Sequence, residues 1–298
     1  MRAFVTGGGG FVGRHLGEHL ASMGDEVTSV DLEVDVADPE AIAAAVGRAR
    51  PEAIYHLAAL SHVGASWGSP AEVLRVNVLG TAGVLGAARA LSDPPVVLVI
   101  SSAEVYGAAE PPGLPITEAA PLRPLSPYAA SKAAAEQLAT QAWLGYRQPV
   151  VVVRPFNHVG PGQGATFAVS ALAQRIVEAQ RTGTGHIAVG TLTARRDYTD
   201  VRDVVRAYRT LVLDGTRGRT YNVCSGTDIS VLDVAHRLCE LAAAEVELVE
   251  DPSLVRPIDL PVLRGDAGRL TADTGWRPEI AFDDTLRDVL EFWRAQAR

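Results

Sequence analysis

Short, continuous apolar segments alternate with helical patterns along the first half of the chain. The apolar segments have the length of strands; they are Ala3–Thr6, Glu26–Val30, Val34–Val36, Ala53–Leu57, Val96–Ile100 and Val150–Val153. The segments with helical spacing are Gly10–Met23, Pro39–Arg48, Ala71–Leu91 and Pro127–Trp143. Strands that are apolar on both faces are typical of a parallel sheet that helices cover on both sides. The sequence therefore predicts an α/β fold with a doubly wound, parallel Rossmann sheet.

The regular alternation of strand-like and helical segments ends after Pro155. A loop rich in glycine, Gly160–Gly164, precedes a predicted helix over Phe167–Arg181, and proline and glycine punctuate the remainder. We expect residues 1–157 with about 196–225 to form the Rossmann domain, and about 158–195 with 226–298 to form a smaller mixed α/β domain. The proline-rich segment Ala108–Pro124 has neither helical nor strand period, so it is a candidate active-site loop.

Composition restricts the kinds of partner. The net charge is −8, and the sequence has no basic stripe, so nucleic acid and anionic membranes are not expected partners. No uninterrupted apolar run is long enough to span a bilayer. The two cysteines, Cys224 and Cys239, do not form a CxxC motif. We expect a protein of the reducing cytoplasm, without a metal site.

A glycine triplet follows the first predicted strand and opens the first predicted helix. Gly7, Gly10 and Gly13 have the spacing GxxGxxG, and Phe11 and Val12 lie between the last two. Glycine allows a tight turn and a close approach of the backbone to a pyrophosphate, which then meets free N–H groups at a helix N-terminus. In this strand–turn–helix context the triplet predicts a dinucleotide-binding site.

The acid at the end of the second predicted strand bears on the choice of dinucleotide. Asp31 can accept hydrogen bonds from the adenosine ribose and repel a 2′-phosphate. No lysine or arginine lies between Arg14 and Arg48, so NAD(H) is favoured over NADP(H). Two alternatives remain: Asp31 is a plain turn residue, or Arg14 reaches a phosphate. Further cofactor contacts are expected at the adenine edge and beside the bound ring; they are Asp35, Val36, Leu57, Ala58 and Ala59.

Tyr128 and Lys132 lie one helical turn apart, on one face of the predicted helix. A free tyrosine has a pKa near ~10, and we expect the Lys132 ammonium to lower the pKa of Tyr128. Ser102 follows a predicted strand, at the edge of the sheet where such folds bind ligands. Together the three form a candidate reduction site. The alternatives are a surface tyrosine with a solvated lysine, and a serine that only caps the strand.

Several motifs in a fixed order resemble the extended short-chain dehydrogenase/reductase family, in particular its nucleotide-sugar branch. They are TGGGGFVG, HLAA, NVLGT, SSAEVYG, SPYAASK, RPFNHVGPGQ and RRDYTDVRDVV. The resemblance covers essentially the whole chain. It implies NAD(P) in the N-terminal domain and a sugar nucleotide in the C-terminal one. It also implies that Asn77 and Thr81 lie near the cofactor, and that Pro155 contributes to the cofactor site.

The segment around Ser102 bears on the reaction. The 4,6-dehydratases that resemble this chain usually have Thr-Asp-Glu where it has Ser102, Ala103 and Glu104. The family's aspartate protonates the departing hydroxyl, which alanine cannot do, so elimination is disfavoured. Glu104 keeps a dehydratase open as an alternative, since GDP-mannose dehydratases use serine at the aspartate position.

Asn157 and His158, followed by Gly-Pro-Gly-Gln, resemble the GDP-sugar members and in particular the GDP-6-deoxy-4-keto-D-mannose reductases. His158 is expected to back the sugar site, and a role as general base is the alternative. Arg196 and Arg256 are predicted to bind the substrate pyrophosphate, because the guanidinium fork matches phosphate oxygens. Their alternatives are an ion pair with a neighbouring aspartate for Arg196 and a solvated loop position for Arg256.

The predicted activity is hydride transfer from NAD(P)H to the C4 ketone of a nucleotide-linked 4-keto-6-deoxyhexose, with GDP-4-keto-6-deoxy-D-mannose favoured. Tyr128 would donate a proton to the ketone oxygen, Ser102 would polarise that oxygen, and Lys132 would hold the ribose. The alternatives are a 4-epimerase with tightly bound NAD, a 4,6-dehydratase and a dinucleotide sensor without catalytic activity.

The predicted helices Ala71–Leu91 and Pro127–Trp143 are apolar around much of their circumference. A helix of this kind is buried on more than one side. One side covers the sheet, and we expect the other to meet a second subunit, so that four helices form the homodimer interface that the family resemblance implies. The alternative is that the chain's own loops cover this surface.

Overall fold

The computed structural model, which describes residues 1–108, 113–254 and 260–297, contains a six-stranded parallel sheet. Its strands are β1 (Arg2–Thr6), β2 (Glu26–Val30), β3 (Ala53–His56), β4 (Val96–Ile100), β5 (Val150–Pro155) and β10 (Thr220–Val223). Their order across the sheet is β10-β5-β4-β3-β1-β2, and each neighbouring pair is parallel. The chain runs outward from β1 in both directions, so the sheet is doubly wound and the predicted fold class is confirmed.

One predicted strand is wrong. Residues 34–36 lie in the irregular connection between β2 and the next helix, and the sixth strand of the sheet is β10, far along the chain. The Asp35 carboxylate accepts a hydrogen bond from the Ala37 N–H, and the Asp38 carboxylate caps the next helix by accepting from the Glu40 and Ala41 N–H groups. Aspartate side chains that bind their own neighbouring backbone favour turns and helix starts over a strand ladder.

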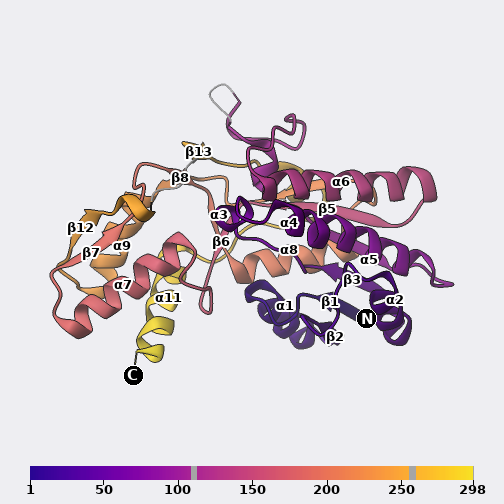
Figure 1. The fold of residues 1–298 in the computed structure, drawn as a ribbon, viewed down its shortest axis with the longest axis horizontal. Helices are drawn as coiled ribbons and strands as arrows, with labels where there is room; N and C mark the ends of the chain where they lie inside the picture. The colour runs from indigo at the N-terminus through magenta and orange to yellow at the C-terminus, as the bar shows by residue number, and fades with distance from the viewer. Residues whose placement is uncertain (109–112, 255–259, 298) are drawn as a thin grey trace.

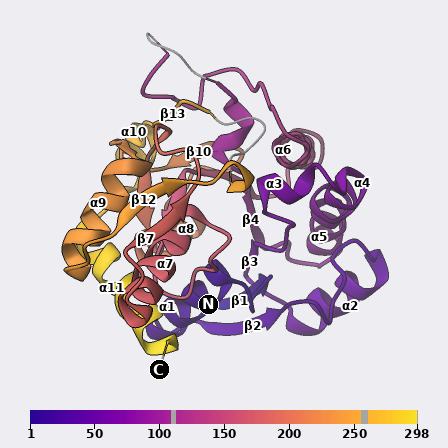
Figure 2. The ribbon, with the colours of Figure 1, turned by 60° about the vertical axis from the view of Figure 1, so that its left-hand side comes forward.

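Helices cover both faces of the sheet. The helices α1 (Phe11–Ser22) and α8 (Val201–Asp214) pack together on one face. The other face carries α2 (Pro39–Ala49), α5 (Gly80–Arg89) and α6 (Pro127–Tyr146). Figure 2 shows the two helical layers on opposite sides of β3 and β4.

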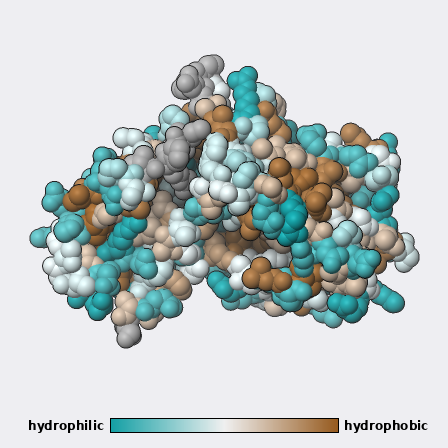
Figure 3. Space-filling view, viewed as in Figure 1, coloured by the Kyte–Doolittle hydropathy of each residue, from teal (hydrophilic) through white to brown (hydrophobic). Residues whose placement is uncertain are grey.

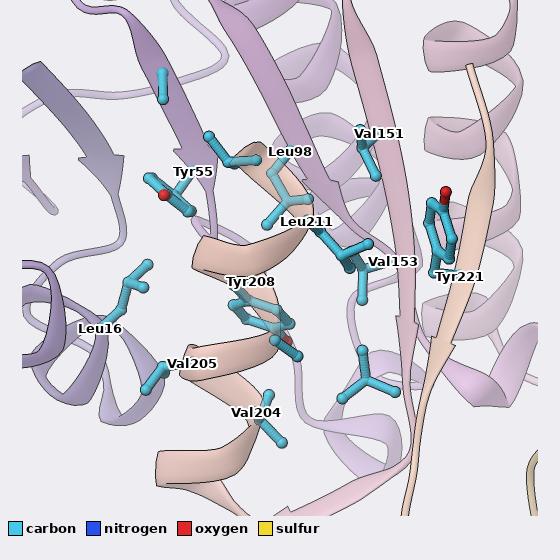
Figure 4. Packing of buried hydrophobic residues seen from close by; sticks show 14 of the residues in the cluster. Leu16, Tyr55, Leu98, Val151, Val153, Val204, Val205, Tyr208, Leu211 and Tyr221 are labelled. Atoms are coloured by element: carbon cyan, nitrogen blue, oxygen red, sulfur yellow. The ribbon is translucent and has the colours of Figure 1, made fainter. Parts of the chain in front are cut away.

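The strands supply alternate side chains to two separate cores. Their sequences are therefore continuous apolar segments. In β3, Tyr55 packs with α1 and α8, whereas Ile54 packs with the helices of the other face. Figure 4 shows the first core, in which Tyr208 and Leu211 of α8 lie against the strands near Leu98. Successive side chains of a strand point to opposite faces, so a sheet that is buried twice needs apolar residues at every position.

The predicted helix over 71–91 is present but is not uniform. It consists of α4 (Pro70–Leu74), a π-helical turn η1 (Arg75–Leu79) and then α5. The stretch Pro70–Arg89 is long and apolar enough to cross a membrane, with a mean hydropathy of 1.2. Composition of this kind also occurs in the core helices of soluble proteins, and this stretch packs against α2 and α6. Single π-helical turns inside α-helices occur frequently at functional sites.

A second lobe lies beside the Rossmann sheet and is drawn on the left of Figure 1. Its main elements are α7 (Ala168–Thr182), β7 (His186–Val189), α9 (Val231–Ala242), β12 (Glu247–Glu250) and α11 (Phe282–Gln296). β7 and β12 pair in parallel, and the three helices enclose one apolar core. The proposed helix over 167–181 is therefore confirmed as α7.

Shorter elements complete the described structure. They are α3 (Val63–Ser66), η2 (Ala103–Tyr106), β6 (Asn157–Val159), β8 (Arg195–Arg196), β9 (Tyr198–Asp200), β11 (Ile229–Ser230), η3 (Pro252–Leu254), β13 (Val262–Leu263) and α10 (Gly268–Thr274). β6 pairs with β9, and β8 lies between β11 and β13. The chain returns from the second lobe to the large sheet through β9, α8 and β10. The exact division into two domains stays a prediction.

Candidate active site

A cleft of about 700 Å³ opens at the carboxyl ends of the central strands, between the large sheet and the short strand β6. Most of the residues predicted for the cofactor and the substrate line it; these are Gly7, Gly10, Phe11, Val12, Gly13, Asp31, Asp35, Val36, Leu57, Ala58, Ala59, Ser102, Ala103, Glu104, Tyr128, Lys132, Pro155, Asn157 and His158. Among the described residues, Asn77 and Arg196 do not line this cleft. Arg256 lies outside the described residues.

The glycine turn makes room for a ligand backbone. Gly7 has φ 71°, in the left-handed region, and a Cβ there would lie 2.8 Å from the Ala58 nitrogen. A Cβ on Gly13 would lie 2.2 Å from the Gly7 carbonyl oxygen. Gly10 precedes α1 without a capping side chain, so no side chain occupies the N–H groups of the first turn. The cradle fits a pyrophosphate at the N-terminus of a helix.

Asp31 follows β2 directly and lies over the glycine turn. A Cβ on Gly9 would lie only 2.1 Å from the Asp31 carboxylate oxygen. The Asp31 N–H donates to the Glu33 carboxylate at 2.8 Å, so a second acid stands beside the first. Arg14 is exposed and donates to the Gly9 carbonyl at 3.0 Å. The carboxylate of Asp31 thus faces the site where the turn admits a ligand.

The sequence motifs did not predict two charged residues that line the same cleft. Arg75, in the π-helical turn, contacts Asp35 at 2.8 Å and Glu72 at 2.8 Å, and both Arg75 and Glu72 line the cleft. The hydrogen bond from the Ala37 N–H, followed by that from Arg75, lowers the pKa of Asp35. The spacing of Glu72 and Arg75 indicates an ion pair on a helix. Their position at the cleft depends on the tertiary contact with Asp35.

Several apolar and polar lining residues were also not predicted. They are Leu32, Val34, Leu60, Ser61, His62, Val63, Val76, Ile100, Ser101, Phe156, Gln163, Phe167, Tyr208 and Leu263. They come from segments far apart in the sequence. Ser101, Phe156 and Gln163 lie within the SSAEVYG and RPFNHVGPGQ motifs, whereas the others carry no motif that would have identified them. Phe167, at the start of α7, shows that the second lobe contributes to the wall.

The start of α6 brings Tyr128 and Lys132 to the cleft. Ser126 caps the helix by accepting from the Ala129 N–H at 3.1 Å, and Pro127 occupies the first helical position. Tyr128 and Lys132 are both buried, at 8% and 6% exposure. Tyr128 is hydrogen-bonded to Ser102, so serine and tyrosine meet as the sequence predicts.

The predicted effect of Lys132 on Tyr128 is wrong in this structure. Burial raises the pKa of Tyr128 to about 12, and the hydrogen bond with Ser102 opposes that shift. Lys132 does not offset it; its ammonium donates to the Ile100 carbonyl at 2.7 Å. Burial also lowers the pKa of Lys132, to about 8. The two shifts have the same cause, since loss of hydration disfavours the charged form of each group.

Ser102 immediately precedes the short 3₁₀ turn η2 and caps it by accepting a hydrogen bond from the Glu104 N–H at 3.2 Å. Ala103 is buried, at 1% exposure, at the position where dehydratases carry their acid. Ser102, Ala103 and Glu104 all line the cleft. The site therefore presents a hydroxyl and a carboxyl group, but Ala103 supplies no proton donor.

Asn77 lies behind the cleft wall and holds it together. Its amide nitrogen donates to the Ser131 hydroxyl at 2.8 Å and to the Leu60 carbonyl at 3.1 Å, and its oxygen accepts from the Leu60 N–H at 2.8 Å. Since Leu60 lines the cleft, Asn77 fixes this part of the wall to α6. Its direct contact with a cofactor stays a prediction.

His158 and Asn157 lie in β6, at the side of the cleft nearer the second lobe. The His158 ring stacks on Phe11 at 6.2 Å, and its Nδ1 lies 3.2 Å from the Phe156 carbonyl. Burial lowers the pKa of His158, whereas the hydrogen bond to the backbone raises it. The ring thus supports the wall of the site next to the glycine turn.

Arg196 is buried at 6% exposure, and its guanidinium donates to the Leu260 carbonyl at 2.6 Å and to the Arg195 carbonyl at 2.8 Å. The neighbouring Asp197 accepts from the N–H groups of Ser225, Gly226 and Gly265. A pyrophosphate contact of Arg196 stays a prediction.

Known proteins match this chain along its whole length. Residues 32–289 match the GDP-mannose 4,6 dehydratase family. GDP-6-deoxy-D-mannose reductase of Pseudomonas aeruginosa is 37% identical over 301 residues, which cover 100% of this chain and 99% of the relative. The structure of RMD from Pseudomonas aeruginosa complexed with NADPH has a TM-score of 0.91 and 34% identity, over 99% of this chain and 100% of that one.

A UDP-glucose 4-epimerase is similar in fold. The enzyme of Thermus thermophilus, in complex with NAD, has a TM-score of 0.89 and 29% identity, over 99% of both chains. The order of the sequence motifs, the glycine turn and the similarities to known proteins all indicate the same family. The chain therefore belongs to the GDP-mannose 4,6 dehydratase family, among the short-chain dehydrogenase/reductase enzymes that act on nucleotide sugars.

Proposed function

We propose that this protein reduces the C4 ketone of a nucleotide-linked 4-keto-6-deoxyhexose, with GDP-4-keto-6-deoxy-D-mannose as the substrate. The observation that carries the proposal is the meeting of Ser102, Tyr128 and Lys132 in one cleft beside the glycine turn. The full-length similarity to GDP-6-deoxy-D-mannose reductase supports the substrate.

The residues of the cleft are suited to protonating a ketone oxygen. A bound NAD(P)H would supply the hydride. Tyr128, with a pKa raised to about 12, stays protonated at neutral pH and can donate its proton to the oxygen that becomes an alcohol. The Ser102 hydroxyl can donate a second hydrogen bond to the same oxygen and stabilise the charge that develops there. The Lys132 ammonium would hold the nicotinamide ribose, as the family resemblance implies.

Asn157 and His158 are proposed to contact the sugar, because they line the cleft on the side of the second lobe. We propose that this lobe, residues 158–195 and 226–298, binds the nucleotide, while residues 1–157 and 196–225 bind the dinucleotide. Arg196 and Arg256 remain the proposed pyrophosphate ligands. Arg196 would need to release the backbone carbonyls that it holds in this structure.

NAD(H) is proposed as the preferred dinucleotide. Asp31 and Glu33 place negative charge beside the glycine turn, where a 2′-phosphate would be repelled. The arginine at the cleft, Arg75, is already engaged by two carboxylates. The similar reductase from Pseudomonas aeruginosa was solved with NADPH, so both dinucleotides belong in the assay.

The experiment is a redox assay with purified protein. GDP-4-keto-6-deoxy-D-mannose, made by a dehydratase, should consume one equivalent of NADH or NADPH and yield a GDP-6-deoxyhexose that mass spectrometry identifies. The GDP-linked ketosugar should be preferred over dTDP-, UDP- and CDP-linked ketosugars. Absence of consumption with all four would overturn the proposal.

A 4-epimerase is the second candidate, because the fold is similar to a UDP-glucose 4-epimerase that was solved with NAD. An epimerase would carry NAD through purification and interconvert two sugars without net consumption of reduced cofactor. A 4,6-dehydratase is the weaker candidate: Glu104 lines the cleft, but the buried Ala103 cannot protonate a leaving hydroxyl.

We also propose a cytoplasmic homodimer. Leu74, Leu79, Leu144 and Tyr146 are exposed by 45%, 56%, 63% and 53%, on α4, η1 and α6. Figure 3 shows apolar surface over this side of the molecule, and two such surfaces would form a four-helix interface. Light scattering should give twice the monomer mass. Cys224 and Cys239 are both free thiols, as in reduced proteins.

A further inference from the structure

A buried glutamate continues the catalytic face of α6 by one more turn. Glu136 is spaced from Lys132 as Lys132 is from Tyr128, and it is buried at 3% exposure. Residues four apart on a helix lie above one another on the same face. Burial of a carboxylate is costly in free energy unless the group is paired and hydrogen-bonded. The contacts of the Glu136 carboxylate must therefore compensate for its burial.

Glu136 contacts Arg154 and Ser101, and Ser101 lines the cleft. One carboxylate oxygen accepts from the Arg154 Nε at 2.9 Å and from the Ser101 hydroxyl, and the other accepts from an Arg154 terminal nitrogen at 2.6 Å. Arg154 lies in β5, where it is 7% exposed. The bidentate contact holds the carboxylate in one orientation.

Ile100, which ends β4, and the two residues that follow it each contact a different turn of α6. The Ile100 carbonyl accepts from Lys132, the Ser101 hydroxyl donates to Glu136, and Ser102 is hydrogen-bonded to Tyr128. The strand end is thus fixed to the helix at every residue. Without the contact at Ser101, the segment that carries Ser102 would be held to α6 by the Ile100 carbonyl and by Tyr128 itself.

The pair also reaches the proline-rich loop. Arg154 donates to the Tyr106 hydroxyl at 2.9 Å and to the Glu118 carbonyl at 3.4 Å. Tyr106 donates to Asn222 at 2.7 Å, and the Asn222 N–H donates to the Glu118 carboxylate at 2.9 Å. One buried network therefore connects α6, β4, β5, β10 and the loop that follows η2.

We infer that Glu136, oriented by Arg154, is a positioning residue of the reduction site: it supports the Lys132 ammonium and fixes the strand end that carries Ser102. The inference rests on the proposed function and adds to it a residue that acts through the catalytic ones. Glu136 favours the charged form of Lys132, which burial disfavours.

The charges around Lys132 come from several elements. Glu136 on α6 and the His56 ring on β3 interact with Lys132 itself, whereas Glu104 in η2 acts on Tyr128 and Arg154 on β5 contacts Glu136. Burial lowers the pKa of His56 to about 3, so this ring is neutral. Arg154 stays cationic and is paired with Glu136, and of the two it is the Glu136 carboxylate that raises the pKa of Lys132.

The test is the pH profile of the variant Glu136→Gln, with Ser101→Ala as the second variant and Glu178→Gln as the control. Glu178 is an exposed carboxylate paired with Arg181 on α7, so removing its charge leaves the site unchanged. For each protein, kcat/KM for the ketosugar and the dissociation constant of NADH are measured between pH 5.5 and 9.5, with circular dichroism to verify folding.

For Glu136→Gln we expect the alkaline limb of the profile to move down by about one pH unit, so that kcat/KM falls about fivefold near pH 8, approaches a tenfold loss near pH 9.5, and approaches the wild type near pH 6. NADH binding should weaken over the same range. For Ser101→Ala we expect kcat to fall several-fold with an unchanged alkaline limb and unchanged NADH affinity.

A uniform loss of activity at every pH for Glu136→Gln, with unchanged NADH titration, would reduce Glu136 to a structural residue and overturn the inference. If that variant does not fold, Ser101→Ala with the kcat of the wild type would also overturn it. Failure of the proposed function gives a different result from failure of this inference. If the proposed function is wrong, the wild-type protein consumes no cofactor with any ketosugar. The NADH titrations of the wild type and the variants can still be compared in that case.

Discussion

The Lys132 ammonium donates a hydrogen bond to the Ile100 carbonyl at 2.7 Å and lies one turn of α6 from Tyr128. The lysine of the site is therefore held by the last residue of β4, immediately before the segment that carries Ser102. This contact ties α6 to the end of β4. Tyr128, Ser102 and Lys132 line the same cleft.

Replacing Tyr128 with phenylalanine should abolish reduction. The variant keeps the ring but loses the proton donor, and kcat should fall by about 10²–10⁴-fold, the contribution typical of a general acid. The dissociation constant of NADH, followed by fluorescence, should change little. Tyr146→Phe, on the exposed end of the same helix, is the matched control. Residual activity near that of the wild type would remove Tyr128 from the mechanism.

The pH dependence of dinucleotide binding should follow Lys132. Its pKa is lowered to about 8 by burial, so the ammonium is present below that pH and lost above it. NADH affinity should therefore decline as the pH rises through about 8. Lys132→Met should bind NADH weakly with no such decline, and titration by fluorescence at several pH values would measure both. A wild-type affinity that stays constant to pH 9.5 would contradict the proposed role of Lys132.

Burial of Lys132 also affects stability. Its pKa is about 8 in the folded protein and about 10.4 in an unfolded chain, so the unfolded chain binds the proton more tightly. The contribution of this group to the free energy of unfolding therefore rises with pH between those two values. In urea unfolding, Lys132→Met should lose this component of the pH dependence relative to the wild type. Identical slopes for the two proteins across the window would contradict the assignment.

Alanine at Gly13 should prevent dinucleotide binding. The added Cβ would lie 2.2 Å from the Gly7 carbonyl oxygen, so the turn would have to open. Gly17→Ala provides the control on the same helix, since a Cβ there meets nothing within 4 Å. That control should bind NADH normally and gain roughly 0.5–1 kcal/mol of stability, because alanine favours a helix. Isothermal titration and thermal unfolding measure the two effects; normal binding by Gly13→Ala would exclude the turn as the pyrophosphate site.

Removal of the Asp31 charge should shift the dinucleotide preference. Asp31→Asn eliminates the repulsion of a 2′-phosphate, and we expect the ratio of kcat/KM for NADPH to that for NADH to rise about tenfold. Asp93→Asn, an exposed aspartate in the loop before β4, is the control for net charge. An unchanged ratio would mean that Asp31 does not face the ribose.

The sequence predicted the large sheet well, because a strand that is buried on both faces needs apolar side chains at every position. It failed at Val34–Val36, where short apolar residues alternate with aspartates whose carboxylates bind the backbone of a turn. The π-helical turn at Arg75–Leu79 has no sequence signal of its own. This segment contacts α6 and, through Arg75, Asp35 in the connection between β2 and α2.

The sequence by itself determined most of the alternation of strands and helices in the first half of the chain, the glycine turn, and the identities of Ser102, Tyr128 and Lys132, since local spacing and residue type carry that information. The tertiary structure decided the pKa values of Tyr128 and Lys132. Burial, which depends on the whole fold, raises the pKa of Tyr128 and lowers that of Lys132, against the expectation from the pair alone. It also brought Glu136, Arg154 and Ser101 together, because only the packing of α6 against β4 and β5 makes these distant residues neighbours.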